Sequence, residues 1–385
     1  MLYAPEPLIA HHFLRSADDG VVSANERGLL RLIWRYPGMS RSELTQQSEL
    51  TQQSVHRILD GLAERGIVLL GSPKPGLGSG QPSPMLRLNG GHAYTCGLSV
   101  TTDVIDICLM DLAGNILAEG SVPLLERSMM EALEQVRLQL TRMKQEQQLT
   151  EAGFFGMGFG IAGFHVSGTR YNASLPLHEW SLIELGPLLS DFFNCPVWVM
   201  NGGKTGTIAE SMFGAGRFIK HFAYLSFNYG FGGGLVSNGE LLLGGNGNAG
   251  EFSQIYLDEE APRRPALQPL MERLNRNGVN VPSITYLRKH FDRDWPGVSE
   301  WVDEVTPAYN RLVNSIWAVF DPQAIIFGGQ VPPAIAQMLV NRTEWYGRAP
   351  RYGVWRPQPK LVISEIGSDA AAMGAAITPF RAAFY

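Results

Sequence analysis

The first ninety residues place apolar and polar positions at helical spacing. The pattern predicts a helix over residues 24–36, a short helix opened by a Ser40–Glu43 capping box, and a third helix that follows a Thr51 cap. Two short apolar runs follow, at 67–70 and 85–88, on either side of a loop rich in Gly, Pro and Ser. Helix, short helix, tight turn, helix and a two-stranded wing describe a winged helix-turn-helix.

The exposed face of the third predicted helix carries side chains that suit DNA. Gln bonds bidentately to adenine, Ser and Thr bond phosphates or bases, and Arg reads guanine or holds phosphate. With the cap of the second helix and two polar residues of the wing loop, the candidate DNA-binding residues are Ser40, Thr51, Gln52, Gln53, Ser54, His56, Arg57, Lys74 and Gln81. The alternative is a solvated helix face with no role in DNA binding.

From residue 94 onward, strand-like apolar runs alternate with helical patterns. The expected strands are 94–100, 104–110, 116–118, 155–161, 197–200, 222–227, 324–327 and 361–363, with a turn at Gly163. Helices are expected at 133–143, 182–193, 303–320 and 369–377. Strands joined by crossover helices indicate an α/β body whose later strands are parallel.

Composition and charge limit the class of protein. A content of 45% hydrophobic and 10% aromatic residues excludes a disordered chain, and 17% charged residues with 43 Gly exclude a coiled coil. The net charge of −5 divides into +1 for residues 1–90 and −6 for the remainder, which suits a nucleic-acid-facing head on an acidic body. No secretory signal or apolar run of about 20 residues appears, so we expect a soluble cytoplasmic protein without membrane contact.

The three cysteines predict neither disulfides nor a metal site. Cys96, Cys108 and Cys195 lie far apart, each in an apolar neighbourhood and without CxxC spacing. We therefore expect buried, reduced thiols.

The order of motifs along nearly the whole chain resembles that of the ROK family of repressors, open reading frames and sugar kinases. The motifs are the linker GSGQPSPMLRL (78–88), GFGIAG (158–163), FGAG (213–216), GFGGG (230–234), GNAGE (247–251), IIFGG (325–329) and DAAAMGAA (369–376). The resemblance implies a winged helix-turn-helix head over 1–90 and an actin-like, two-lobed sugar-kinase body over 91–385, in a homo-oligomer. Lobe one would span about 91–202 plus the C-terminal helix, and lobe two about 203–364.

The chain departs from the kinases of that family where catalysis would occur. Those kinases carry Asn-Asp where this chain has Asn201-Gly202, and glycine cannot accept the proton of a sugar hydroxyl. The first phosphate loop, 97–102, holds β-branched residues, and the second contains the bulky Tyr229. We therefore predict a degenerate site without enzymatic activity, and glycines at 230 and 232–234 that serve a tight hairpin.

The zinc motif of the family is also absent. Where the resemblance leads one to expect Glu-x-Gly-His and three cysteines, the chain has Glu251-Phe252-Ser253-Gln254 and a Pro/Arg-rich stretch. Gln is a poor zinc ligand, so we predict no structural metal and no cofactor.

A sugar-type ligand is the remaining possibility for the cleft. The resemblance places Asn201 and Glu251 at positions that bond sugar hydroxyls, with Gly163 beside them and Glu272 as a weaker candidate. Alternatively, Asn201 caps a helix starting near residue 205 and Glu251 holds a turn.

These features favour a DNA-binding transcriptional regulator, in particular a repressor that binds a palindromic operator as a homodimer or homotetramer. A sugar or sugar derivative would be its effector. The alternatives are an ATP-dependent sugar kinase and a DNA-binding regulator controlled by a protein partner.

Overall fold

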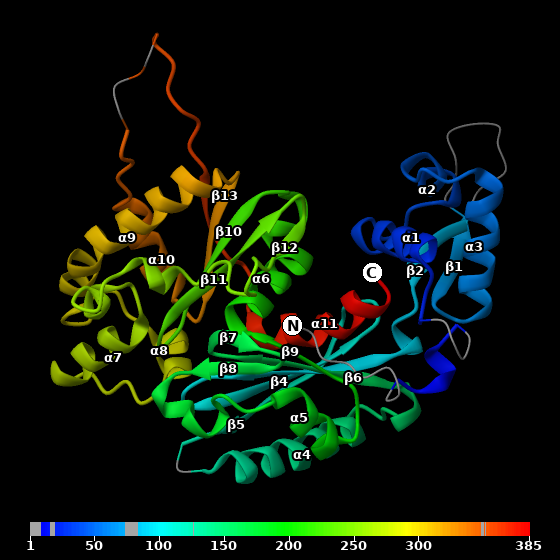
Figure 1. The fold of residues 1–385 in the computed structure, drawn as a ribbon, viewed down its shortest axis with the longest axis horizontal. Coiled ribbons are helices and arrows are strands. Elements are labelled where there is room, and N and C mark those ends of the chain that lie inside the picture. Colours follow the sequence, from blue (N-terminus) through cyan, green and yellow to red (C-terminus); the bar gives the residue numbers. More distant parts are fainter. Residues whose placement is uncertain (1–8, 16–19, 74–83, 126, 348–349, 351) are drawn as a thin grey trace.

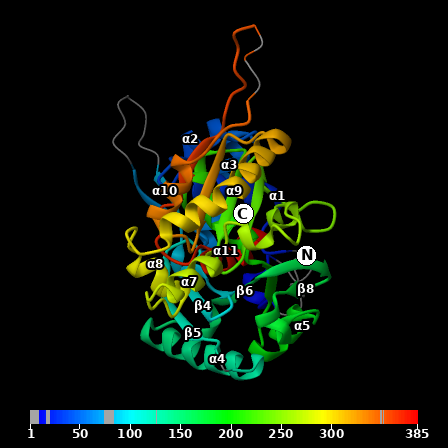
Figure 2. The same cartoon turned by 90° about the vertical axis from the view of Figure 1, so that its left-hand side faces the viewer.

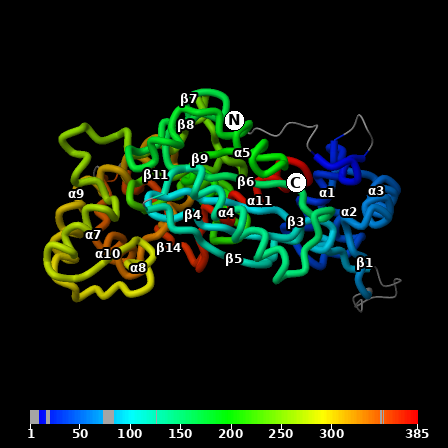
Figure 3. The backbone as a smooth tube through the Cα atoms, turned by 90° about the horizontal axis from the view of Figure 1, so that it is seen from below, coloured from blue at the N-terminus to red at the C-terminus, as the bar shows by residue number. Residues whose placement is uncertain are grey.

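The computed structural model describes residues 9–15, 20–73, 84–125, 127–347, 350 and 352–385. A small head lies at one end of the molecule, and a body built around two five-stranded sheets makes up the rest (Figure 1). Figure 3 shows the strands of the first sheet between the head and the helices at the far end of the body.

The head has the predicted order of elements. Its helices are α1 (Ala24–Arg35), α2 (Arg41–Gln47) and α3 (Gln52–Glu64), and an antiparallel pair, β1 (Val68–Pro73) and β2 (Pro84–Leu88), forms the wing. Ser40 makes the predicted capping box with Glu43, and the Thr51 hydroxyl accepts the Ser54 amide, so both predicted caps are confirmed. A one-turn helix, η2 (His11–Phe13), precedes these elements.

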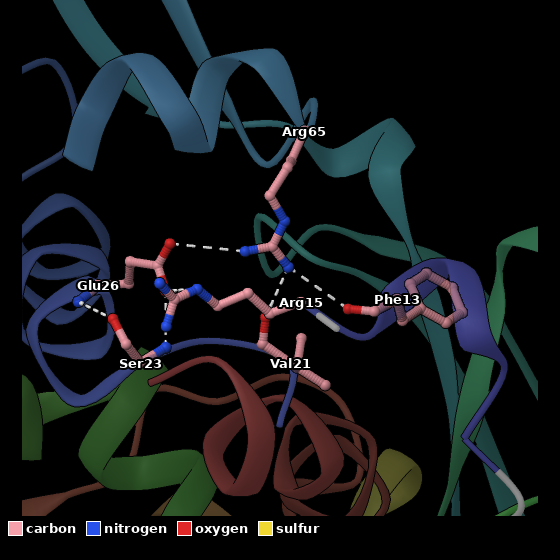
Figure 4. Close-up of polar contacts among 6 residues, drawn as sticks. All are labelled: Phe13, Arg15, Val21, Ser23, Glu26 and Arg65. Carbon is pink, nitrogen blue, oxygen red and sulfur yellow. Dashed lines mark hydrogen bonds and ion pairs between the residues drawn. The ribbon is translucent and has the colours of Figure 1, made fainter. Parts of the chain in front are cut away.

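Arg65, just after α3, connects three parts of the head (Figure 4). Its guanidinium donates to the carbonyls of Val21 (2.6 Å) and Phe13 (3.4 Å) and lies 3.5 Å from a carboxylate oxygen of Glu26. Glu26 is itself only 8% exposed, because it closes the capping box with Ser23 at the start of α1. The segment before α1 is thereby fixed to the end of α3.

Lobe one contains a sheet in the order β5-β4-β3-β6-β9. Its strands are β3 (Tyr94–Val100), β4 (Val104–Asp111), β5 (Ile116–Pro123), β6 (Phe154–Ile161) and β9 (Val197–Asn201), and β6 pairs in parallel with both β3 and β9. α4 (Met129–Glu146) and α5 (Leu185–Phe193) cover one face, as Figures 1 and 2 show, and α11 (Ala370–Ala383) packs on the other. A hairpin, β7 (Gly163–Ser167) and β8 (Arg170–Ala173), stands where only a turn was expected.

Lobe two contains the second sheet, in the order β12-β11-β10-β13-β14. Its strands are β10 (Phe222–Phe227), β11 (Phe231–Ser237), β12 (Glu240–Leu242), β13 (Ala324–Gly329) and β14 (Lys360–Ile363). Its helices are α6 (Gly202–Phe213), α7 (Leu267–Arg276), α8 (Ile284–His290), α9 (Val298–Phe320) and α10 (Pro333–Asn341). The glycines after Tyr229 belong to the β10–β11 hairpin, where Phe227 pairs with Phe231.

The last helix is longer than predicted, and its extra turns join the head to the body. The pattern indicated an end at residue 377, whereas α11 continues to Ala383. Phe380 and Phe384 are fully buried in one apolar cluster with Phe13 and Leu30 of the head and Phe155 of β6. The burial of these rings against a surface distant in sequence explains the extension.

We predict that Arg65→Gln destabilises the protein. Loss of the guanidinium leaves the carbonyls of Val21 and Phe13 without this donor and removes one of the two cations beside the mostly buried Glu26, so the free energy of unfolding should fall by about 1–3 kcal/mol. Urea unfolding measures the change. The control Arg137→Gln removes a fully exposed pair with Glu134 on α4 and should leave stability almost unchanged. Equal effects of the two substitutions would contradict the role assigned to Arg65.

Candidate ligand-binding cleft and DNA-recognition surface

Helix α3 presents the predicted DNA-binding side chains away from the head's core. Val55, Leu59 and Leu62 are fully buried, and these positions fix which face of the helix is turned inward. On the remaining surface Gln52, Gln53 and Arg57 are exposed. The Arg41–Asp60 ion pair (2.5 Å) connects α2 to α3.

The other candidates for DNA binding differ in how free their side chains are. Ser54 and His56 are half-buried, and the Thr51 hydroxyl donates to the Ser54 hydroxyl (2.9 Å) while it caps α3. The Ser40 hydroxyl caps α2, and its backbone pairs with Met85 of the wing. Lys74 and Gln81 lie outside the described residues.

A cavity of about 240 Å³ lies between the two lobes of the body. Its walls include the carboxyl ends of β3, β6, β9 and β10, because parallel strands from the two sheets end here. Residues of these walls include Thr101, Gly163, Asn201, Asn228 and Glu251. Three of the four predicted ligand-binding residues, Gly163, Asn201 and Glu251, are thus brought together.

Asn201 is the polar centre of this cleft. Its amide group donates to the Gly163 carbonyl (2.7 Å) and to a carboxylate oxygen of Glu251 (3.1 Å). Its side-chain oxygen accepts the amide of Lys204 (3.1 Å), so it also caps α6. Asn201 therefore caps α6, as the alternative hypothesis predicted, and also lies in the cleft beside Glu251, as the ligand hypothesis requires.

Lys204, on α6, is the buried cation whose charge acts on Glu251. The lysine is 2% exposed and donates its ammonium group to the Gly247 carbonyl. Burial raises the pKa of Glu251, whereas the nearby ammonium lowers it. Burial also lowers the pKa of Lys204, and the Glu251 carboxylate opposes this. Glu251 and Asn201 together present a carboxyl group and an amide, which suit the hydroxyl groups of a polyol.

Tyr229 connects the two lobes across the cleft. Its hydroxyl donates to a carboxylate oxygen of Asp103 (2.8 Å), and Asp103 in turn accepts the Thr101 hydroxyl (3.2 Å). The ring thus stands between the two loops that the family resemblance associates with phosphate.

Gly202 also lines the cleft, and space for a side chain exists there. A Cβ atom built at this position would meet only the backbone of Ile161, at 3.7 Å, which is ordinary van der Waals contact. The backbone around residue 202 thus does not require glycine on steric grounds. The difference from the kinases at this position is the missing carboxylate.

The structure does not bring Glu272 to this cleft. It lies on α7, exposed, and accepts a hydrogen bond from Gln268 (2.9 Å) one turn earlier. The resemblance to the family is lost in the segment before Glu272, so this residue was only near the place where the family has a Glu after its cysteines.

Other residues of the cleft were missed by the sequence analysis. Asn172, Ser174 and Arg264 line it. Asn172 lies in β8 of the unpredicted β7–β8 hairpin, Ser174 directly follows that strand, and Arg264 belongs to the Pro/Arg-rich stretch. Within the described ranges no three His, Cys, Asp or Glu side chains gather as a metal ion requires.

A pair of carboxyl groups, Asp106 and Asp369, lies at the base of α11. Asp369 caps this helix through the Ala372 amide and accepts the Gln330 amide group (2.6 Å) from lobe two. Burial first, and then the carboxyl groups of Asp369 and Asp103, raise the pKa of Asp106 to about 8. Burial likewise raises the pKa of Asp369.

Comparison with known proteins explains this architecture. The family model described as "ROK family" matches residues 95–266. The chain carries a ROK family domain. The fold of the chain is similar to that of a ROK family transcriptional regulator homologous to Escherichia coli MLC, with a TM-score of 0.68, 20% identity and coverage of 94% of this chain and 96% of that one. The ROK family glucokinase of Streptomyces griseus, in complex with glucose and AMPPNP, matches 74% of this chain and 98% of its own with a TM-score of 0.59 and 18% identity.

Curated relatives of the chain include repressors. The Escherichia coli DNA-binding transcriptional dual regulator NagC is 24% identical over 83% of this chain and 84% of its own length. The xylose repressor of Bacillus spizizenii is 27% identical, and the aligned part spans 63% of each chain, which is less than two thirds of that repressor. An uncharacterised protein, y4fQ, of Sinorhizobium fredii is 27% identical over 94% of this chain and 92% of its own.

The predicted α/β, actin-like fold is confirmed. No helix in the described part of the chain combines the length and apolar character that crossing a membrane requires.

We predict that Asp106→Asn changes how stability depends on pH. The unfolded chain releases the Asp106 proton near pH 4, whereas the folded protein keeps it until about pH 8. Stability of the wild type should therefore fall as pH rises through this window, and the asparagine variant should lack that part of the fall. Urea unfolding at pH 5 and pH 8 measures it. A stability difference between the proteins that is the same at both pH values would contradict this assignment.

Proposed function

We propose that this chain is a sequence-specific DNA-binding transcriptional regulator that acts as a repressor. The observation that carries the proposal is the outward face of α3, where Gln52, Gln53 and Arg57 stand exposed on a winged helix-turn-helix attached to a ROK domain. Gln and Arg are the side chains that read base edges in the major groove. The names of NagC and of the xylose repressor support the same function.

The cleft between the lobes would bind the effector, a sugar or sugar derivative. Asn201 and Glu251 offer donors and acceptors to paired hydroxyl groups, and the cavity of about 240 Å³ accommodates a small molecule. A ligand that touches both lobes favours one degree of lobe closure and so shifts the population of head positions.

We further propose that the protein is not a kinase. Gly202 supplies no group that accepts a proton from a sugar hydroxyl, and Tyr229 stands beside the glycine turn that would approach a phosphate. A coupled assay of ADP release over hexoses and N-acetylhexosamines should show no turnover, and turnover would restore the kinase hypothesis.

Recognition of a palindromic operator implies two heads related by symmetry, so we propose a homodimer or homotetramer that acts in the cytoplasm. No cofactor or structural metal is part of this proposal.

We predict that Arg57→Ala and Gln53→Ala weaken operator binding, with the control Arg293→Ala, in lobe two, unchanged. Each lost base contact should weaken binding by about 1–3 kcal/mol. If Arg57 holds a phosphate, the slope of log affinity against log salt should fall by about one. Fluorescence anisotropy on fragments selected by gel shift measures both quantities. Sequence-independent binding, or variants equal to wild type, would contradict the proposal.

We predict that one class of sugar or sugar phosphate raises the melting temperature of the wild type and not of Glu251→Gln. A ligand that binds only the folded state stabilises it by about 2.7 kcal/mol at a hundred times its dissociation constant. A thermal-shift panel measures this. A melting temperature that no sugar changes would favour control by a protein partner. If a sugar stabilises Glu251→Gln as much as the wild type, Glu251 is not part of the binding site.

A further inference from the structure

Helix α1 of the head carries three arginines on successive turns, and each of these side chains contacts the body. They are Arg27, Arg31 and Arg35. Arg27 donates to four main-chain oxygens at the end of the chain, those of Arg381, Ala382, Ala383 and Tyr385, at 2.7–3.2 Å. These include the unpaired carbonyls at the carboxyl end of α11, where the helix dipole favours a cation. The requirements of Arg27 are therefore met within the protein.

The next arginine, Arg31, shares its partner with a residue of α11. One carboxylate oxygen of Glu240, at the start of β12, lies 3.2 Å from Arg31, and the other lies 3.1 Å from Arg381. A single carboxylate thus balances two guanidinium groups, and both of its oxygens are occupied.

The third arginine, Arg35, and its neighbour Arg217 do not share a carboxylate in this way. Arg35 donates to the main-chain carbonyl of Arg217 (3.0 Å), and the Arg217 guanidinium lies over the exposed ring of Phe218. Neither guanidinium has a carboxylate partner anywhere in the described part of the chain.

All four of these arginines, Arg31, Arg35, Arg217 and Arg381, line one cavity of about 280 Å³ between the head and the body. Trp34 and Tyr385 supply apolar walls, and Glu240 is the only acidic residue in the lining. Counted over its side chains alone, the lining carries a formal charge of +3, from four guanidinium groups and one carboxylate. We name this the seam cavity.

Burial and the neighbouring cation both disfavour the charged form of Arg381. Burial lowers the pKa of Arg381, Glu240 raises it, and the charge of Arg31 lowers it again. An anion that enters the cavity would relieve this repulsion and give the two unbalanced guanidinium groups a partner.

We propose that the seam cavity is a binding site for a small multivalent oxyanion, of the organic phosphate or polycarboxylate class. Guanidinium groups bind both kinds of anion bidentately, and the cavity volume suits a compact molecule. The site is separate from the interlobe cleft, with which it shares no lining residue.

The location of the seam cavity makes such a ligand regulatory. Its walls come from the head (α1), from lobe two (residues 216–219 and 238–240) and from α11, which packs on lobe one. An oxyanion bound there would tie the head to lobe two. It would add to the contacts of Arg31 with Glu240 and of Arg35 with the Arg217 carbonyl, and so stabilise the packing of the head against the body.

Isothermal titration calorimetry of the full chain with inorganic pyrophosphate and with citrate, at low salt and in a phosphate-free buffer, tests the proposal. We expect at least one probe to bind, and the comparison of the two identifies phosphate or carboxylate as the preferred chemistry. Arg217→Ala removes a guanidinium but keeps the main-chain carbonyl that Arg35 uses, and it should weaken binding about tenfold or more. Added salt should weaken binding further.

A second variant is expected to raise the affinity for the anion. Glu240→Gln removes the competing carboxylate, so it should strengthen binding, whereas a variant that merely damaged the seam would weaken it. The control Arg137→Ala, on the outer surface of α4, should leave binding unchanged. The proposal is overturned if neither probe binds the wild type, if Arg217→Ala binds as tightly as wild type, or if Glu240→Gln weakens binding. Loss of binding in Glu251→Gln would assign the anion to the interlobe cleft and also overturn it.

Discussion

The contact between Arg27 and the carboxyl end of α11 is the interaction on which the arrangement of the molecule depends. A helix leaves its last carbonyls without intrahelical partners, and here the head supplies the missing donor. Phe380 and Phe384 bury their rings beside this contact, in one cluster with Phe13 and Leu30 of the head. The head therefore shares a hydrophobic core with lobe one and is more than an appendage on a linker.

The opposite end of α11 reaches the region between the lobes. Asp369 caps it there and binds Gln330 of lobe two, and Ala371 lines the interlobe cleft. One helix thus connects the cleft proposed for the effector with the head proposed for DNA (Figure 1). Arg31 and Arg35 add a second connection, from the head to lobe two. A change in the angle between the lobes consequently alters the surroundings of α1.

The sequence predicted most of this fold because local signals and tertiary packing agree. The caps at Ser40 and Thr51 and the apolar stripe of α3 are local features, and each is present in the structure. The last turns of α11 were missed because their stability comes from contacts with a head that is distant in the sequence. Arg27 and Arg381, for example, are 354 residues apart. The β7–β8 hairpin was missed because its two strands, of five and four residues, are short.

In the cleft, too, residues within sequence motifs were predicted correctly, whereas a residue outside any motif was not. Asn201, Glu251 and Gly163 follow recognisable motifs, and they meet because parallel strands end at one edge. Glu272 lies in a segment without such a motif, and distance along the chain gave a wrong position for it. The seam cavity combines residues of α1, β12 and α11, and no pattern within any one of these elements indicates that they converge.

Native-state hydrogen exchange of the full chain tests most directly the central claim that head and lobe one form one cooperative unit. The account predicts that the slowest amides of α3, β3 and α11 exchange with the same free energy of opening. It also predicts that Arg27→Ala lowers this value for α3. Amides of α3 that open in the wild type at much lower free energy than those of β3, and that do not respond to Arg27→Ala, would contradict it.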